Sequence, residues 1–168
     1  MAAGTIQDRF QGLIEEHKKI LYKVCNLYCR NRADREDLAQ EITIQLWRSF
    51  GRFDGRCRFS TWMYRIALNV AISFYRSESA RDRHVLAAGE FLLDVVDEAA
   101  GPSDDLALLY VFIEELDALN KALMLLYLDG NSYEEIAAVL GISETNVATK
   151  LSRIKSRMKQ EFGKGEAK

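Results

Sequence analysis

The segment between residues 58 and 76 interleaves aromatic and arginine side chains along one predicted helix. One face of that helix carries Trp62, Arg65, Asn69, Ser73 and Arg76. An aromatic ring can stack on an unpaired base, an amide can hydrogen-bond to the base edge, and arginines can hold the phosphate backbone. The face therefore predicts a site for single-stranded nucleic acid, although Trp62 taken alone fits core packing equally well.

The same helix is expected to bury another side, and the loop before it is expected to add cations. Apolar residues at three- and four-residue spacing predict a core stripe of Met63, Ile66, Ala67, Val70 and Phe74. Two glycines and an aspartate mark residues 51–58 as a loop. Arg56 and Arg58 lie at the end of this loop, so we expect them to extend the cationic surface.

A second pattern with a defined geometry occupies residues 131–158. Ser132 and Glu135 form the S-x-x-E capping box that starts a helix, and Gly141 supplies the left-handed residue that ends it. Ser143 is then placed to cap a second helix. A helix, a glycine turn and a helix in this order predict a helix-turn-helix.

The second helix of such a motif presents its exposed N-terminal part to the major groove of DNA. The residues expected on that surface are Thr145, Asn146, Thr149, Lys150, Ser152 and Arg153. Lys155 and Arg157 follow them and suit phosphate contacts, which set affinity and register rather than sequence preference. The competing interpretation is a helical hairpin whose lysine-rich face is only solvated.

A polar stripe marks the helix predicted at residues 35–50. Its members, at helical spacing, are Asp37, Gln40, Glu41 and Ile44. The stripe is either a solvated face or a surface that docks another protein, with its charges setting how the two proteins align. The other side of the helix is expected to bury Leu38, Ile42, Leu46 and Trp47.

One face of the helix predicted at residues 6–30 carries His17, Cys25 and Cys29. Thiols with an imidazole are plausible ligands for zinc or a heavy metal, so a metal- or redox-responsive sensor is one alternative. His17 and Cys25 also lie on the apolar stripe of this helix, and unpaired cysteines are commonly buried, which favours core packing without a metal. No phosphate-cradling glycine loop, H-E-x-x-H or G-x-S-x-G is present. We therefore expect neither an enzyme nor a cofactor.

Charge is strongly segregated along a chain whose formal net charge is only −2. Residues 48–83 hold eight arginines against three acids, and residues 84–118 hold nine acids and no lysine or arginine. Residues 143–168 hold seven basic residues against three acids. Two basic blocks thus flank an acidic one, which favours separate surfaces for an anionic partner.

The 168-residue chain is expected to be all-α, because it has a single proline and little β-branched alternation. Three helices form a domain at residues 1–78, an acidic linker with a possible short helix covers 79–103, and the helix-turn-helix domain covers 104–168. No apolar run approaches the ~20 residues of a membrane span, and the N-terminus lacks the apolar stretch of a signal peptide. Three cysteines without disulfide-like spacing fit a reducing compartment, so we expect a cytoplasmic protein that does not insert into a membrane.

Three stretches together resemble the extracytoplasmic-function branch of the sigma-70 family of bacterial RNA polymerase initiation factors. DREDLAQEITIQLWRSF resembles the family's core-binding helix, and RFSTWMYRIALNVAISFYR resembles its −10 melting and recognition segment. LDGNSYEEIAAVLGISETNVATKLSRIKSRM resembles its −35 reading domain. The chain departs from the family's usual Leu-Pro at the start of the last domain, where it has Leu116-Asp117, and it lacks basic residues at Leu126 and Ala148.

The resemblance implies a role for each surface in promoter-specific transcription initiation. The stripe with Asp37 and Glu41 would meet the clamp of the largest polymerase subunit, and the chain would also meet the flap of the second largest. Asn69 matches an asparagine used beside a pocket for a flipped base. Thr149 and Arg153 match −35 contact positions. The resemblance further implies control by an anti-sigma factor, and the residue-based alternative is a stand-alone helix-turn-helix regulator.

Overall fold

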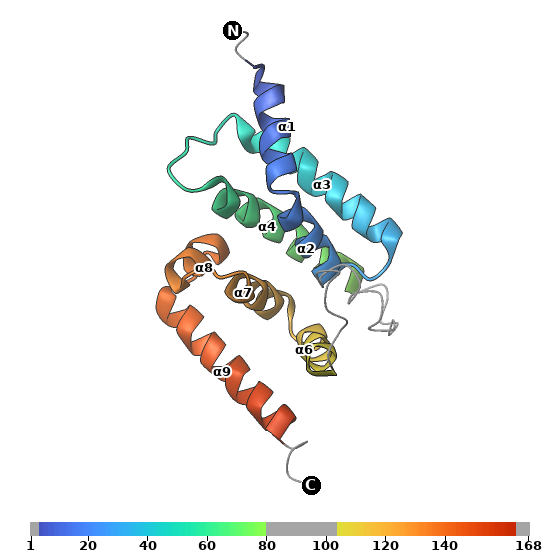
Figure 1. The fold of residues 1–168 in the computed structure, drawn as a ribbon, viewed down its shortest axis with the longest axis vertical. Coiled ribbons are helices and arrows are strands. Elements are labelled where there is room, and N and C mark those ends of the chain that lie inside the picture. The colour runs from blue at the N-terminus through green and yellow to red at the C-terminus, as the bar shows by residue number, and fades with distance from the viewer. Residues whose placement is uncertain (1–3, 80–103, 164–168) are drawn as a thin grey trace. The chain divides into compact units, whose positions relative to one another are not determined.

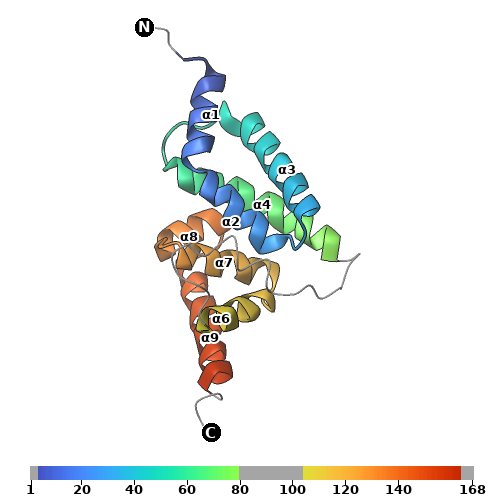
Figure 2. The same ribbon diagram turned by 45° about the vertical axis from the view of Figure 1, so that its right-hand side comes forward.

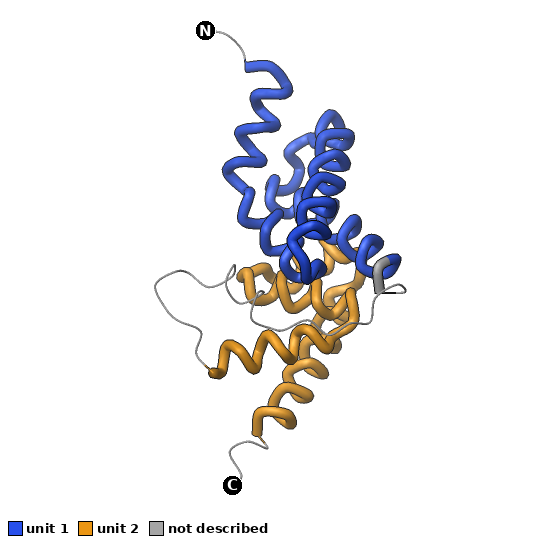
Figure 3. The backbone as a smooth tube through the Cα atoms, turned by 90° about the vertical axis from the view of Figure 1, so that its right-hand side faces the viewer, with its two compact units in different colours: residues 1–100 blue, residues 101–168 orange. Residues whose placement is uncertain are grey.

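The computed structural model of the protein describes residues 4–79 and 104–163. Within these ranges the chain forms α-helices and no strands. It divides into two compact units, residues 1–100 and residues 101–168, which Figure 3 shows in different colours. The predicted all-α class with two small helical domains is therefore confirmed.

The predicted linker at residues 79–103 lies outside the described residues, except that Ser79 ends a helix. The short helix expected within that linker also lies outside them. No helix in the described part of the chain is long and apolar enough to cross a bilayer.

The first unit begins with two helices where the sequence predicts one over residues 6–30. These are α1 (Ile6–Glu16) and α2 (Lys18–Tyr28), and they meet at an angle in Figures 1 and 2. His17 lies between them at φ −108° and ψ 17°. Its carbonyl accepts a hydrogen bond from the Ile20 N–H at 3.0 Å, which closes a tight four-residue turn. The apolar stripe continues across this break, so periodicity alone does not reveal it.

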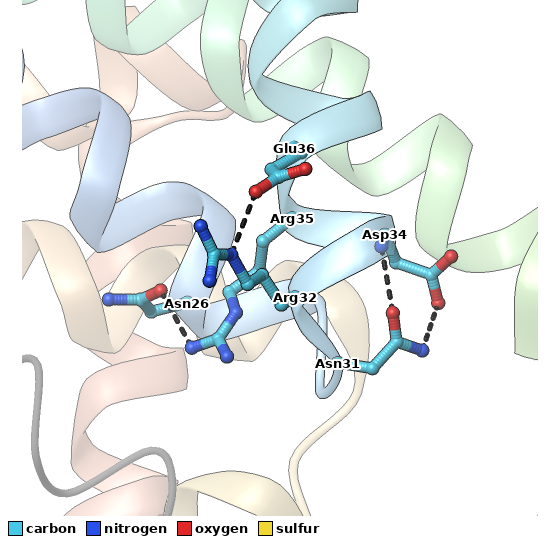
Figure 4. A network of polar contacts seen from close by, with 6 residues as sticks. All are labelled: Asn26, Asn31, Arg32, Asp34, Arg35 and Glu36. Carbon is cyan, nitrogen blue, oxygen red and sulfur yellow. Dashed lines mark hydrogen bonds and ion pairs between the residues drawn. The ribbon is translucent and has the colours of Figure 1, made fainter.

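The next helix, α3 (Arg32–Phe50), begins three residues before the predicted start because Asn31 caps it. The Asn31 Oδ1 accepts a hydrogen bond from the Asp34 N–H at 2.8 Å, and Arg35 Nη1 donates to Asn26 Oδ1 of α2 at 3.3 Å (Figure 4). The predicted burial of Leu38, Ile42 and Leu46 is confirmed. The predicted burial of Trp47 is wrong, since this side chain is 47% exposed.

The last helix of the first unit, α4 (Phe59–Ser79), packs against both α2 and α3. It begins at Phe59, directly after the loop at residues 51–58. Met63 and Ala67 are buried as predicted, but Ile66, Val70 and Phe74 are only half-buried. In their place the core takes Tyr64, Leu68 and Ala71. The buried face is rotated because α2 and α3 cover α4 from two directions.

The ends of the loop at residues 51–58 are anchored by a cluster of aromatic rings. Phe53 lies 5.6 Å from Phe59 and 5.1 Å from Trp62, measured between ring centroids, and Phe50 lies 6.2 Å from Trp62. Edge-to-face and tilted pairs of this kind each contribute roughly 0.5–1.5 kcal/mol beyond the buried area. The cluster thus fixes where the loop leaves α3 and where it enters α4.

The described residues of the second unit form four helices: α6 (Asp104–Glu114), α7 (Ala118–Leu128), α8 (Tyr133–Leu140) and α9 (Glu144–Gly163). Asp117, at the position where the family usually has proline, caps α7 by accepting a hydrogen bond from the Asn120 N–H at 2.8 Å. An N-capping aspartate therefore starts this helix, instead of a proline whose ring fixes the φ angle.

The predicted helix-turn-helix is confirmed in α8 and α9. Ser132 and Glu135 form both hydrogen bonds of the capping box, and Gly141 adopts the left-handed conformation at φ 70°. The Ser143 Oγ accepts a hydrogen bond from the Asn146 N–H at 3.1 Å. α9 buries Val147, Leu151 and Ile154 against the rest of the unit.

Candidate nucleic-acid interface

The exposed face of α4 carries most of the residues predicted to bind a single strand. Arg65, Asn69, Ser73 and Arg76 are exposed along it. Trp62 is half-buried, and its ring lies 5.3 Å from the ring of Phe59 within the aromatic cluster. The Asn69 amide, the Ser73 hydroxyl and the two guanidinium groups thus lie on one surface. The Trp62 indole lies at the edge of this surface and packs partly against the aromatic cluster.

The two arginines predicted at the end of the loop are both exposed. Arg56 forms an ion pair with Asp54, with Nε 3.0 Å from Oδ2, and Arg58 immediately precedes α4. The Asp54 side chain also accepts a hydrogen bond from the Arg56 N–H at 3.0 Å. Because both members of the pair are highly exposed, it orders the loop tip without removing the cation from solvent.

A groove of about 560 Å³ lies between α3 and α4, beside Asn69. Its lining consists of Glu41, Gln45, Ser49, Ile66, Asn69, Val70, Ser73, Phe74 and Ser77. Gln45 and Ser49 were not among the site residues predicted from the sequence. Their four-residue spacing places them on one side of α3, but only the packing of α3 against α4 shows what that side faces.

The four residues of the predicted protein-docking stripe on α3 are all exposed, and Ile44 is 44% exposed. A second groove, about 720 Å³ in volume, lies on the α1 side of this stripe and includes Phe10, Ile14, Ile44 and Trp47 in its wall. The Trp47 ring stands edge-on to Phe10 at a centroid distance of 5.1 Å. Trp47 thus belongs to an exposed apolar surface beside the stripe, and its apolar type alone led to the wrong expectation of burial.

In the second unit, the exposed side of α9 carries the residues predicted to read DNA. Those that are exposed are Thr145, Asn146, Thr149, Ser152 and Arg153, whereas Lys150 is half-buried. The Thr149 hydroxyl donates to the Thr145 carbonyl at 2.9 Å, which fixes the rotamer of its side chain. Arg153 is exposed one turn after Thr149.

Lys155 and Arg157, predicted as phosphate contacts, also serve the second unit itself. Lys155 Nζ lies 4.5 Å from the centre of the Tyr127 ring, and its hydrogen bond with Tyr127 raises the pKa of the ammonium group. Arg157 pairs with Glu115 at 3.0 Å and with Glu161 at 2.9 Å. Lys155 therefore stays charged at neutral pH, and Arg157 holds α9 at the corner between α6 and α7.

The residues of the metal-sensor alternative are largely internal. Cys25 and Cys29 are buried, and the His17 Nδ1 lies 3.0 Å from the Leu13 carbonyl oxygen. Burial raises the pKa of the Cys25 thiol to about 12, with a smaller opposing effect of the Arg35 charge. In the part of the chain that the structure describes, no three or more His, Cys, Asp or Glu side chains are grouped so that they could hold a metal ion.

Comparison with known protein families gives two matches that together cover most of the chain. The model of sigma-70 region 2 matches residues 13–81, and the model of sigma-70 region 4 matches residues 106–158. These two ranges contain α2 to α4, α7, α8 and most of α6 and α9, and thus both candidate surfaces.

Individual relatives agree with these matches. The ECF RNA polymerase sigma factor SigX of Bacillus subtilis (strain 168) is 28% identical over 153 residues, covering 86% of this chain and 78% of SigX. The ECF RNA polymerase sigma-E factor of Escherichia coli (strain K12) is 32% identical over 146 residues, covering 79% of this chain and 76% of that factor.

A solved structure shows that the fold is shared. The sigma factor RpoE of Bartonella quintana, crystallised in complex with the anti-sigma factor NepR, has a TM-score of 0.63 and 21% identity, covering 92% of this chain and 96% of that one. At this level of identity the likeness concerns the fold. With both family models matched and a relative above 30% identity, the chain belongs to the extracytoplasmic-function branch of the sigma-70 family of RNA polymerase sigma factors.

Proposed function

We propose that this sigma factor directs promoter-specific initiation through two separate surfaces. Residues 1–78 bind core polymerase and the melted −10 strand, and residues 104–168 read the −35 duplex. The observation that carries the proposal is the α4 face, where Asn69 and Ser73 lie exposed between the exposed Arg65 and Arg76. The polar groups can hydrogen-bond to the bases of an unstacked strand, and the cations on either side can bind its phosphates.

The core-binding surface is the stripe on α3. Asp37, Gln40 and Glu41 supply charge and hydrogen-bonding groups, and Ile44 adds an exposed apolar contact. A polar stripe with an apolar neighbour suits a stable protein–protein contact, in which apolar anchors give affinity and charges give register. We assign this surface to the clamp of the largest polymerase subunit, and we assign the flap of the second largest subunit as a further contact of the chain.

The −35 surface is the exposed N-terminal half of α9. Its hydroxyl and amide side chains suit base edges in the major groove, and Lys150 and Arg153 suit guanine or phosphate. Phosphate contacts from neighbouring cations would then fix the register of the helix. The chain supplies recognition, and the polymerase carries out catalysis.

Regulation by an anti-sigma factor is part of the same proposal. The Bartonella quintana neighbour is bound to such a factor in its crystal structure, and its fold matches nearly the whole chain. A partner that covers the stripe on α3 would block polymerase, and one that covers α9 would block DNA. We place the protein in the cytoplasm, where core polymerase and promoter DNA are found.

Run-off transcription tests the proposal. Core polymerase is incubated with and without the chain on a library of random promoters, and transcripts are sequenced from their 5′ ends. We expect start sites that appear only with the chain and share one −10 and one −35 sequence. Absence of association with core polymerase, or tight binding of promoter duplex by the chain alone without new start sites, would support a stand-alone regulator instead.

A further inference from the structure

A concave pocket of about 320 Å³ lies on the second unit, between the first turn of α8 and the central turns of α9. The side chains around it are small, polar or cationic: Tyr133, Ala148, Ser152, Lys155, Ser156 and Lys159. Tyr133 forms the α8 wall, and the other five residues follow one side of α9 at helical spacing. The volume falls at the lower end of the range for small-molecule sites.

Two lysines line this pocket without an acidic neighbour. Among the described residues that line it, none is acidic. Lys155 and Lys159 lie one turn apart on α9, and like charges at this spacing repel each other. Lys155 Nζ lies 4.5 Å from the centre of the Tyr127 ring, whereas Lys159 is exposed and makes no ion pair or hydrogen bond with another described residue. An anion in the pocket would offset the repulsion between the two ammonium groups.

Three hydroxyl groups complete the lining. Ser152 and Ser156 are exposed and make no hydrogen bond with another described residue. The Tyr133 hydroxyl is added from α8, and this side chain is 37% exposed. Hydroxyl and ammonium groups are hydrogen-bond donors, and bonds to a charged oxygen are roughly twice as strong as neutral ones. The lining therefore suits an oxyanion with several oxygens, such as a phosphate group.

The charge of the pocket favours a phosphate monoester over a diester. A monoester carries nearly two negative charges at neutral pH, which matches the two lysines, and it has three terminal oxygens that can enter a concave site. A diester in the DNA backbone carries a single negative charge and continues into a sugar on both sides. The pocket thus has the charge and the shape for the end of a small molecule.

We propose that this pocket binds a small molecule that carries a phosphate monoester, and that the bound ligand competes with −35 DNA. Ser152 belongs both to the pocket and to the surface that we propose reads the duplex, so the two ligands exclude each other. The competition rests on the proposed function, whereas the binding of the ligand does not. A backbone phosphate of the duplex is the competing occupant of the pocket.

Nuclear magnetic resonance of the full chain, labelled with nitrogen-15, tests the binding. Phenyl phosphate is the monoester probe and dimethyl phosphate is the diester probe. Both are titrated at a pH well above the second pKa of a phosphate monoester, which is about 6, and at constant ionic strength set with sodium chloride. We expect amide shifts confined to Tyr133 and the central turns of α9, with a Kd of about 1 mM for phenyl phosphate and binding of dimethyl phosphate at least about tenfold weaker.

Two variants separate the pocket from a general attraction between charges. Lys159→Ala removes one cation and should weaken phenyl phosphate binding about tenfold, and Lys159→Arg should restore most of that loss. Ala148→Leu keeps both lysines but adds a larger side chain to the lining, and it should also weaken binding about tenfold. Lys18→Ala, at an exposed position of α2, removes the same charge elsewhere and should change nothing. Helical circular dichroism should be the same for all variants.

Holoenzyme assembled from core polymerase and the full chain tests the competition. Its affinity for a duplex −35 element is measured by fluorescence anisotropy, with phenyl phosphate at about ten times its Kd or with sodium chloride at the same ionic strength. Mass action predicts an apparent affinity about tenfold lower with phenyl phosphate. In holoenzyme that carries Lys159→Ala, the same concentration should lower it only about twofold.

Equal affinity for the two probes, amide shifts outside the pocket, or unchanged binding by Lys159→Ala and Ala148→Leu would overturn the inference and leave the proposed function intact. If Lys159→Ala weakened duplex binding while phenyl phosphate did not bind, the pocket would belong to the DNA backbone and the inference would also be overturned. Phenyl phosphate that binds in the pocket without lowering the affinity for the duplex would overturn the competition. Failure of wild-type holoenzyme to bind any −35 duplex, with phenyl phosphate still bound by the chain, would instead reject the proposed function.

Discussion

Arg157 of α9 donates a hydrogen bond from Nη2 to Oε2 of Glu115 at 3.0 Å, across 42 positions of the chain. The same guanidinium carbon lies 5.2 Å from the centre of the Phe112 ring. One side chain on α9, the helix that we propose reads DNA, thus connects it to α6 and to the turn before α7. This contact sets the direction in which α9 presents its exposed face.

Replacement of Arg157 tests that structural role. We expect Arg157→Ala to lower the free energy of unfolding of the second unit by about 1 kcal/mol, because a half-exposed ion pair and a cation–π contact made by an exposed arginine are each weak. Urea denaturation followed by circular dichroism measures the change. Arg157→Lys should recover only part of it, since a lysine cannot keep the forked geometry. A variant with unchanged stability but weaker DNA binding would show that Arg157 acts on phosphate instead.

Replacement of Asn69 should separate strand opening from polymerase binding. We expect Asn69→Ala to lower run-off initiation about tenfold or more, because the amide is exposed beside the groove and has no structural hydrogen bond to lose. Permanganate footprinting of the −10 region measures opening directly. Lys19→Ala, an exposed change on α2, is the control. Normal opening by Asn69→Ala would refute the assigned role of this residue.

Replacement of Arg153 should weaken recognition of the −35 duplex alone. We expect Arg153→Ala to reduce holoenzyme affinity for a duplex −35 element about tenfold, and to lower the salt slope by about one if the contact is to phosphate. Affinity measured over a range of salt concentrations distinguishes a base contact from a phosphate contact. Opening of a premelted −10 template should stay normal, and a defect there would argue against the division of roles between the two units.

Gly141 is the one residue of the helix-turn-helix that needs a left-handed backbone. We expect Gly141→Ala to lower the free energy of unfolding by about 1 kcal/mol, because a side chain at φ 70° is strained even though open space surrounds the position. Gly12→Ala, in the exposed middle of α1, is the matched control and should raise stability by about 0.5–1 kcal/mol. Equal effects of the two changes in thermal denaturation would contradict this reasoning.

The cysteines should differ sharply in reactivity. Cys57 is exposed, whereas the pKa of the buried Cys25 thiol is raised from 9.0 to about 12. At pH 8 we expect one thiol to react fast with Ellman's reagent in the folded protein, and Cys57→Ser should remove that phase. Between about pH 9 and pH 12 the unfolded chain loses the Cys25 proton while the folded chain keeps it, so stability should fall as pH rises through this range. A rapid reaction of two thiols at pH 8 would contradict the burial.

The sequence predicts the features that nearby residues determine better than those that tertiary packing determines. α8 matches its predicted bounds at both ends, because a capping box and a left-handed glycine decide them within a few residues. The break at His17 has no glycine or proline to mark it. The buried face of α4 was predicted with the wrong orientation because it depends on where α2 and α3 lie, which no helical pattern contains.

The candidate site divides in the same way. The exposure of Arg65, Asn69 and Ser73 follows from the pattern of α4, and the structure agrees with it. The participation of Gln45 does not follow, because it requires the side of α3 that adjoins α4 to be known. Trp62 has both a ring partner and an exposed edge, so neither of the two sequence interpretations describes it completely.

The aromatic anchors at the two ends of residues 51–58 also have an evolutionary consequence. Phe50 and Phe59 secure the backbone on either side, while the residues from Asp54 to Arg58 stay exposed and carry no core packing. Mutations in that tip can accumulate at little cost to folding. Because we propose that this tip contacts the −10 strand, a descendant of this gene could acquire a different promoter preference, and a new regulon, without first passing through an unstable intermediate.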